Sequence, residues 1–138
     1  MSGMDGATIP QGEPSVFMRA AGLQLAEVTP RTVTGWIDLG PEHHQPWGLV
    51  HGGVYTSAIE TAASVGASTA AAEHGLVAVG VNNNTNFLRS MVSGRVDVRA
   101  VAIQQGRTAQ LWEVRVTDDE DRLVAIGQLR LQNVTPRA

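Results

Sequence analysis

One segment constrains the fold of this chain more than any other feature. Residues 53 to about 74 contain no proline and are rich in alanine, the best helix former, and Gly75 follows as a helix stop. A helix of that length would be roughly 30 Å long. Its small side chains would let it lie close against a sheet, which predicts one long helix at the centre of the domain.

The sequence on both sides of this segment predicts β-strands. Residues 23–28 and 32–39 come before it and are joined at Pro30, which favours a turn. Four stretches of alternating residues come after it, at 77–87, 96–102, 112–116 and 123–131. In the first stretch, one face is expected to carry Val77, Val79, Val81, Asn83, Thr85 and Phe87. Polar junctions at 105–107 and 118–121 indicate hairpin turns, so the sheet should be antiparallel.

Together these elements predict an α+β fold, with an antiparallel sheet of five to six strands wrapped around one long central helix. A chain of 138 residues fits a single domain, placed at 15–138 after a flexible N-terminal segment at 1–14. Residues 15–21 are expected to form a short helix. A sheet covered by one helix leaves unpaired edges, so a homo-oligomer is expected.

Composition excludes several functions. The net charge of −3 argues against a nucleic-acid surface, which would need a basic stripe to neutralise phosphates. Cysteine is absent and all ten basic residues are arginine, which excludes a cysteine nucleophile, a Schiff-base lysine and a Walker-type loop. The N-terminus does not resemble a signal peptide, and Glu60 interrupts the one long apolar stretch, so no membrane span is expected. The expected compartment is therefore the cytoplasm.

A candidate site lies on the predicted central helix. Steps of i, i+4, i+7 and i+11 place Gly53, Ser57, Glu60 and Ser64 on one face. A lone carboxylate in an apolar helix is expensive to bury unless it has a use. The simpler interpretation, a glutamate on the solvated face of an alanine-rich helix, stays open.

The start of the same helix favours a chemical role. Gly52 and Gly53 let the backbone approach a ligand closely, although paired glycines also make plain turns. Unpaired amides and the positive end of the helix dipole favour an oxyanion there. Glu60 would follow roughly 10 Å along the axis. An oxyanion hole with an acid, and no Ser-His pair, suits acyl transfer from a good leaving group such as a thiolate.

These residues also resemble a known family. His51-Gly52-Gly53 followed by Glu60 is similar to the hot-dog-fold thioesterases of the phenylacetyl-CoA and 4-hydroxybenzoyl-CoA type. The similarity continues at 84–89, 106–108 and 123–127, and spans about 23 to 132. The resemblance implies hydrolysis of an acyl-CoA with an aromatic or short- to medium-chain acyl group. It implies no cofactor, because CoA is part of the substrate.

Within the resemblance, five positions match catalytic residues. Glu60 matches the carboxylate that acts as nucleophile or general base, and the Gly52 amide matches the donor that polarises the thioester carbonyl. His51 matches a residue that positions the loop and the substrate. Gln45 falls where the family has Asn or Gln near the thioester, and Ser64 where a hydroxyl holds the attacking water. Glu60 with Gln45 resembles the 4-hydroxybenzoyl-CoA branch.

The family site lies between two subunits of a dimer or dimer of dimers, and the resemblance implies a set of substrate- and CoA-binding residues there. They are Gly53, Asn83, Asn86, Arg89, Ser90, Arg107 and Thr108. Arg89 and Arg107 are candidates for CoA phosphates because arginine forms bidentate phosphate bonds, although each could be a solvated loop charge. Trp47 and Ser90 depart from the family pattern.

Other functions agree less well with the sequence. His43, His44 and His51 could suggest a metal site, but adjacent histidines usually diverge and no acidic pair supports one, so no metal is expected. A non-catalytic module that binds acyl-CoA or another small ligand remains an alternative on the same fold. A hot-dog dehydratase is weaker, because its usual His-plus-acid pair is not evident. Glu60 with Gln45 and Ser64 favours the thioesterase.

Overall fold

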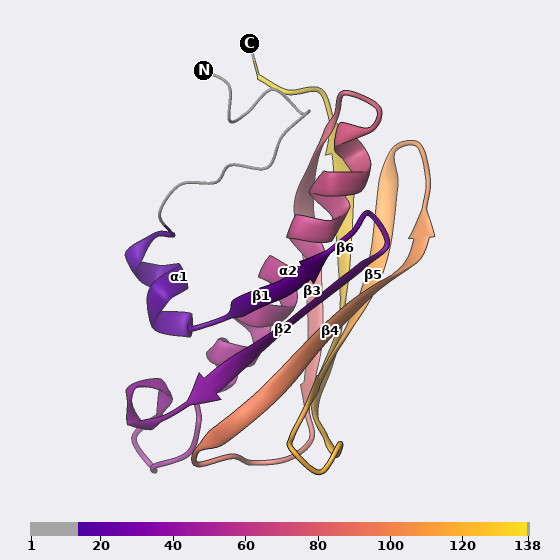
Figure 1. Cartoon of the computed structure of the whole chain (residues 1–138). Helices are drawn as coiled ribbons and strands as arrows, with labels where there is room; N and C mark the ends of the chain where they lie inside the picture. The colour runs from indigo at the N-terminus through magenta and orange to yellow at the C-terminus, as the bar shows by residue number, and fades with distance from the viewer. Residues whose placement is uncertain (1–13, 138) are drawn as a thin grey trace.

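The computed structural model describes residues 14–137, so the proposed flexible segment 1–14 lies almost wholly outside the described residues. One antiparallel sheet of six strands, in the order β1-β2-β4-β5-β6-β3, curves around a long helix, α2 (Figure 1). The strands are β1 (Gln24–Val28), β2 (Thr32–Leu39), β3 (Val77–Phe87), β4 (Gly94–Gln105), β5 (Ala109–Thr117) and β6 (Leu123–Val134). The helices are α1 (Val16–Ala21), the short 3-10 helix η2 (Pro41–His43) and α2 (Gly52–Ala72). The predicted α+β fold, with its antiparallel sheet and one long helix, is confirmed.

Small side chains let α2 lie directly on the sheet. Its buried positions are mostly alanine, among them Ala62, Ala63 and Ala67. At Gly66 a Cβ atom would lie 2.4 Å from the Trp112 ring of β5, so only glycine fits at that contact. In residues 14–137 no helix is long and apolar enough to cross a membrane.

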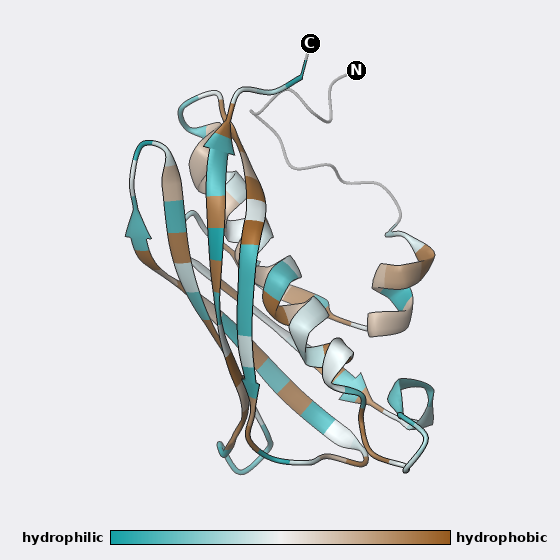
Figure 2. Ribbon diagram, turned by 180° about the vertical axis from the view of Figure 1, so that it is seen from behind, coloured by the Kyte–Doolittle hydropathy of each residue, from teal (hydrophilic) through white to brown (hydrophobic). Residues whose placement is uncertain are grey.

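Alternation along the strands builds the core under α2, and Figure 2 shows the apolar and polar bands along them. The predicted inward faces of β4, β5 and β6 are confirmed by buried Val96, Val98, Trp112, Val114 and Leu129. Each strand pairs with its neighbour in antiparallel register, for example Val98 with Val116 and Trp112 with Leu129.

The predicted face of β3 is wrong in its first half. The register of β3 against β6 shifts between Gly80 and Asn82, so Val81 occupies a β-bulge. Before the bulge, Ala78 packs on the core and Gly80 faces α2, while Val79 and Val81 are each 48% exposed. After it, the predicted face turns inward. The valine alternation hid one inserted residue, which a periodicity of two cannot reveal.

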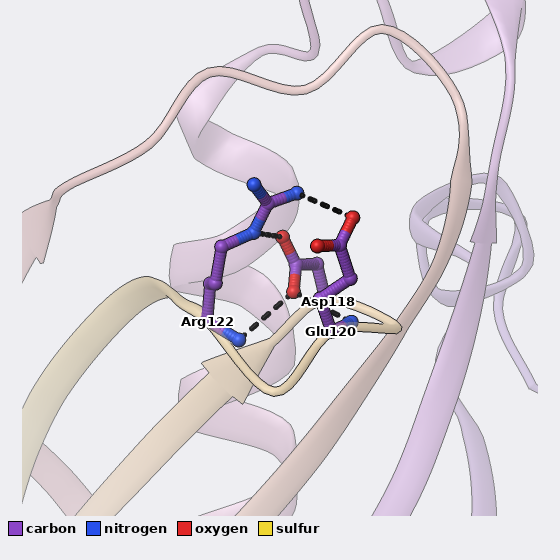
Figure 3. A network of polar contacts seen from close by, with 3 residues as sticks. All are labelled: Asp118, Glu120 and Arg122. Carbon is purple, nitrogen blue, oxygen red and sulfur yellow. Dashed lines mark hydrogen bonds and ion pairs between the residues drawn. The ribbon is translucent and has the colours of Figure 1, made fainter.

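The β5–β6 turn, predicted at 118–121, is held by a polar network (Figure 3). The buried Asp118 carboxylate accepts hydrogen bonds from the amides of Glu120 and Arg122 at 3.0 and 2.9 Å, and from Arg122 Nε at 2.8 Å. Burial alone would raise the pKa of the Asp118 carboxyl. The hydrogen bonds from Arg122 and Glu120 outweigh it and lower that pKa below its ordinary value.

This network predicts a pH-dependent stability. Because the folded-state pKa of Asp118 lies below the unfolded value, its contribution is present above about pH 4 and is lost as the pH falls through the folded pKa. We expect Asp118→Asn to lower the urea midpoint at pH 7, and the gap from wild type to narrow below pH 4. Asp119→Asn, at an exposed position of the same turn, is the control and should behave as wild type. A constant gap from pH 7 to pH 3 would contradict this origin.

Candidate active site

The start of α2 is shaped by His51. Its ring Nδ1 accepts a hydrogen bond from the Gly53 amide at 2.7 Å, which makes His51 the N-cap. The Val54 amide donates to the His51 carbonyl at 3.0 Å. Of the amides at positions 52–54, therefore, that of Gly52 makes no hydrogen bond within residues 14–137. This unbonded amide lies at the position where the sequence predicts a donor to the ligand.

Glycine at position 52 leaves room for the Phe87 ring of β3, which would have to move to admit a larger residue. A Cβ atom there would lie 2.8 Å from Cζ of Phe87, whose ring covers the start of the helix. At Gly53 a Cβ atom would lie 2.8 Å from His51 Nδ1, so a side chain would disturb the cap. Gly53 therefore serves the helix start, and its amide is already used.

A hollow of about 350 Å³ opens beside this amide. Its lining includes four predicted residues, Gln45, Gly52, Arg89 and Ser90. The Gln45 Oε1 atom accepts from the Trp47 amide at 2.6 Å, which leaves the Nε2 amide as the free donor of that side chain. Two hydrogen-bond donors, from Gln45 and Gly52, thus border one hollow. The cationic side chain of Arg89 also lines it.

Glu60 lies two turns further along α2 and is exposed. Its Oε2 atom would be 3.6 Å from a Cβ atom placed on Gly80, so the carboxylate faces the bulged part of β3. Glu60 makes no hydrogen bond or ion pair within the described residues. It borders a second hollow of about 340 Å³, which it shares with Asn83 and Thr56.

The remaining residues of the helix face have distinct surroundings. Ser64, one turn after Glu60, is half-buried, and its hydroxyl makes no hydrogen bond within the part of the chain described. The Ser57 hydroxyl donates to the Gly53 carbonyl at 2.6 Å and is therefore used within the helix. Asn83 donates to the Thr56 carbonyl at 3.1 Å and accepts from Thr85 at 2.7 Å, so it ties β3 to α2.

Three predicted CoA-binding residues lie elsewhere. Asn86 is exposed, between the inward-facing Thr85 and Phe87. Arg107 and Thr108 belong to the β4–β5 turn, and Arg107 borders a separate hollow with His74 at the far end of α2. Within one chain, Arg89 and Arg107 therefore lie at opposite ends of the sheet.

The three histidines of the loop bond to separate backbone groups. His43 accepts from the Gly40 amide, and its Nε2 lies 3.0 Å from the Ala20 carbonyl oxygen. His44 Nε2 lies 2.7 Å from the Val92 oxygen, and His51 caps α2. Among residues 14–137, no three His, Asp or Glu side chains are grouped as a metal would require.

Sequence reasoning missed Tyr55. Its ring is 3% exposed, lies 6.3 Å from the Phe87 ring and borders the hollow beside Gly52. The Tyr55 hydroxyl is buried and makes no hydrogen bond within the described chain, and burial raises the pKa of Tyr55 to about 12. The sequence feature that could have drawn attention to Tyr55 is the presence of one tyrosine in an alanine-rich helix.

Comparison with known proteins agrees with this architecture. Residues 48–125 match the sequence profile of the Thioesterase superfamily. The Mycobacterium tuberculosis protein Rv1847 is 48% identical over 123 residues, 88% of each chain, and its structure superposes with a TM-score of 0.84, covering 88% of this chain and 98% of that one. A 1,4-dihydroxy-2-naphthoyl-CoA hydrolase of Listeria monocytogenes is 33% identical over 78% of this chain and 86% of its own. A variant of thioesterase PA1618 from Pseudomonas aeruginosa is 28% identical with a TM-score of 0.80, over 88% of this chain and 86% of its own.

The fold and the site thus define a hot-dog thioester hydrolase. The chain belongs to the thioesterase superfamily.

Tyr55 yields a prediction on stability. If its hydroxyl has no partner in solution, Tyr55→Phe should raise the free energy of unfolding, by up to about 1–3 kcal/mol. Thr85→Val is the matched control, because it deletes a hydroxyl that donates to Asn83 and should lower stability by about 1 kcal/mol. Chemical denaturation measures both. A loss above 1 kcal/mol for Tyr55→Phe would show that the hydroxyl is bonded in solution.

Proposed function

We propose that the protein hydrolyses an acyl-CoA, with the Gly52 amide as carbonyl donor and Glu60 as the reacting acid. The observation that carries the proposal is that each α2 offers an amide at its start and an exposed carboxylate at Glu60, neither of which makes a hydrogen bond within residues 14–137. Attack on a thioester carbonyl by Glu60, or by water that Glu60 activates, needs no metal ion. The thioester carbonyl accepts from Gly52, and the developing oxyanion strengthens that hydrogen bond.

Two mechanisms are compatible with Glu60 as the reacting acid, one nucleophilic and one with general-base catalysis. As a nucleophile, its carboxylate attacks the carbonyl carbon, CoA leaves as thiolate and takes a proton, and water then releases the acid from the mixed anhydride. As a general base, it draws a proton from water, the hydroxide attacks, and the proton passes to the thiolate. We assign the holding of that water to Ser64, one turn after Glu60, whose hydroxyl makes no hydrogen bond within residues 14–137. Gln45 is a second donor toward the carbonyl.

One chain does not hold a complete site. Gly52 and Glu60 are eight residues apart on a helix, so their backbones lie roughly 12 Å apart along the axis. They also border different hollows. A single carbonyl group does not reach both, which supports a site made from Gly52 of one chain and Glu60 of another.

The edge strand β3 provides a route to such a dimer. It is 11 residues long, contains no proline or lysine, and exposes Val79 and Val81. The other edge strand, β1, has five residues. α2 runs antiparallel to β3, since Gly52 meets Phe87, Thr56 meets Asn83 and Glu60 meets Gly80. Two-fold pairing of β3 strands would therefore bring the start of one α2 toward the middle of the other.

Pairing of two β3 strands would also bring Arg89 of one chain close to Arg107 of the other. Arg89 follows the end of β3, whereas Arg107 lies near its beginning, beside the end of α2. In an antiparallel pair of β3 strands, the end of one strand lies near the beginning of the other. Arg89 of one chain and Arg107 of the second would then share one end of the dimer and could bind the phosphates of one CoA.

The acyl group is proposed from the relatives. The Listeria monocytogenes protein is named for hydrolysis of an aromatic acyl-CoA, which favours an aromatic acyl group here. The alternative function, an acyl-CoA binding module without catalysis, uses the same hollows. The unpaired carboxylate favours hydrolysis, because binding alone does not need an acid at that place.

Replacement of the acid tests the proposed chemistry. Glu60→Gln keeps the shape and removes the charge, and should lower kcat by roughly 10²–10⁴-fold with little change in KM. Glu27→Gln, at an exposed position of β1 that lines none of the hollows described, is the control and should keep wild-type turnover. Thiol release from aromatic and aliphatic acyl-CoAs measures both. Near-wild-type turnover by Glu60→Gln would contradict the mechanism, and tight binding without hydrolysis by the wild type would support the binding module.

Removal of an arginine tests the CoA contact. Arg89→Ala should raise KM more than it lowers kcat, because a phosphate contact changes little toward the transition state. The loss should disappear with a pantetheine-truncated substrate. Arg130→Ala, at an exposed position of β6, is the control. An equal effect on full and truncated substrates would argue against phosphate binding by Arg89.

The split site predicts an oligomer. Sedimentation at micromolar concentration should give a mass of at least twice the 14.6 kDa of the chain. A monomer with full thioesterase activity would contradict both the dimer and the shared site.

A further inference from the structure

Two hollows meet under α1. The hollow that Glu60 borders is lined in part by Phe17 and Met18 of α1. Another hollow, of about 360 Å³, lies between α1, α2 and the start of β1, and reaches Leu25. The two share four lining residues, so they form one groove that begins at the carboxylate. Their shared residues are Phe17, Met18, Ser57 and Thr61.

Helix α1 is capped at both ends and is tied to η2 by a polar contact. Ser15 caps its start, and Gly22, with a φ of 87°, ends it. The Gly40 amide donates to His43 Nδ1, so His43 Nε2 carries the proton and donates to the Ala20 carbonyl at 3.0 Å. None of the six residues of α1 is buried. The helix stands beside α2 (Figure 1) without its apolar side chains filling the space between them.

The groove presents mostly carbon to an occupant. Phe17 is 67% and Met18 44% exposed, although both line it. Leu25 borders its far end, and Ala58 is part of its floor. The Ser57 hydroxyl is already bonded to the Gly53 carbonyl, so it does not demand a polar partner. Exposed aromatic and thioether groups around a hollow of this size are typical of a site for an apolar ligand.

We infer that this groove, which we call the α1 groove, holds the acyl group of the substrate while its carbonyl lies at Glu60. The inference rests on the proposed function and adds the acyl-selecting residues, Phe17 and Met18, from the same chain as the acid. An acetyl group has little apolar surface to bury against Phe17 and Met18 and therefore gains little affinity from them. A six-carbon or aromatic acyl group removes apolar surface of Phe17 and Met18 from water and gains affinity.

The test compares acyl groups of different size. Phe17→Ala and Met18→Ala should each lower kcat/KM about tenfold for hexanoyl-CoA and benzoyl-CoA, and less than twofold for acetyl-CoA. Leu25→Trp, which fills the far end, should lower the hexanoyl-CoA value and spare that for acetyl-CoA. Val16→Ala is the matched control, because Val16 lies on the same helix, is 77% exposed and lines neither hollow. Equal losses for all three substrates, or none, would overturn the α1 groove as the acyl site.

A binding measurement separates this inference from the proposed function. Calorimetry should show that hexanoyl-CoA binds to Glu60→Gln more tightly than CoA does, and that Phe17→Ala in this background removes the difference. If the wild type releases no thiol from any substrate but this difference is found, hydrolysis fails and the α1 groove stands. If thiol release is normal and hexanoyl-CoA binds no tighter than CoA, the α1 groove fails alone.

Discussion

The close approach of α2 to the sheet is the constraint on which the rest of the structure depends. At Gly66 the helix touches Trp112 with no room for a Cβ atom, and its alanines bury their methyl groups on the strands. Buried Gln110 supports that contact, since its side chain accepts from Trp112 Nε1 at 2.9 Å and donates to the Ala67 carbonyl at 3.0 Å. Because the helix is fixed this closely, its first amides and its one carboxylate have defined positions.

The groups proposed for catalysis lie where this packing stops. The His51 ring and carbonyl take the amides of Gly53 and Val54, and the remaining Gly52 amide faces a hollow. Two turns later Glu60 faces Gly80 of β3, where a Cβ atom would lie 3.6 Å from Oε2 of the carboxylate. The bulge at Val81 reverses the faces of β3 just beyond that point. It therefore places glycine, not valine, opposite the acid.

Much of the fold could be predicted from sequence because it follows from local patterns. The alanine-rich segment gave the helix to within two residues at each end, and alternation gave the inward faces of β4 to β6. The bulge in β3 could not be found, because an inserted residue leaves the run of valines looking regular. The hydroxyl of Tyr55 could not be judged either, since its lack of a partner depends on packing that no local pattern encodes. The sequence pattern also could not show that Gly52 and Glu60 border two separate hollows, because that separation depends on tertiary structure.

The central claim, that Gly52 of one chain and Glu60 of another make each site, has a direct test. Gly52→Pro removes the amide donor at a position where His51 already has an extended backbone, although Phe87 must move to admit the ring. Two affinity tags allow hybrid dimers to be isolated, one of Gly52→Pro with Glu60→Gln and one of wild type with the double variant. A shared site predicts about half of wild-type thiol release from the first hybrid and almost none from the second. The reverse result, activity only in the hybrid that contains a wild-type chain, would contradict the account.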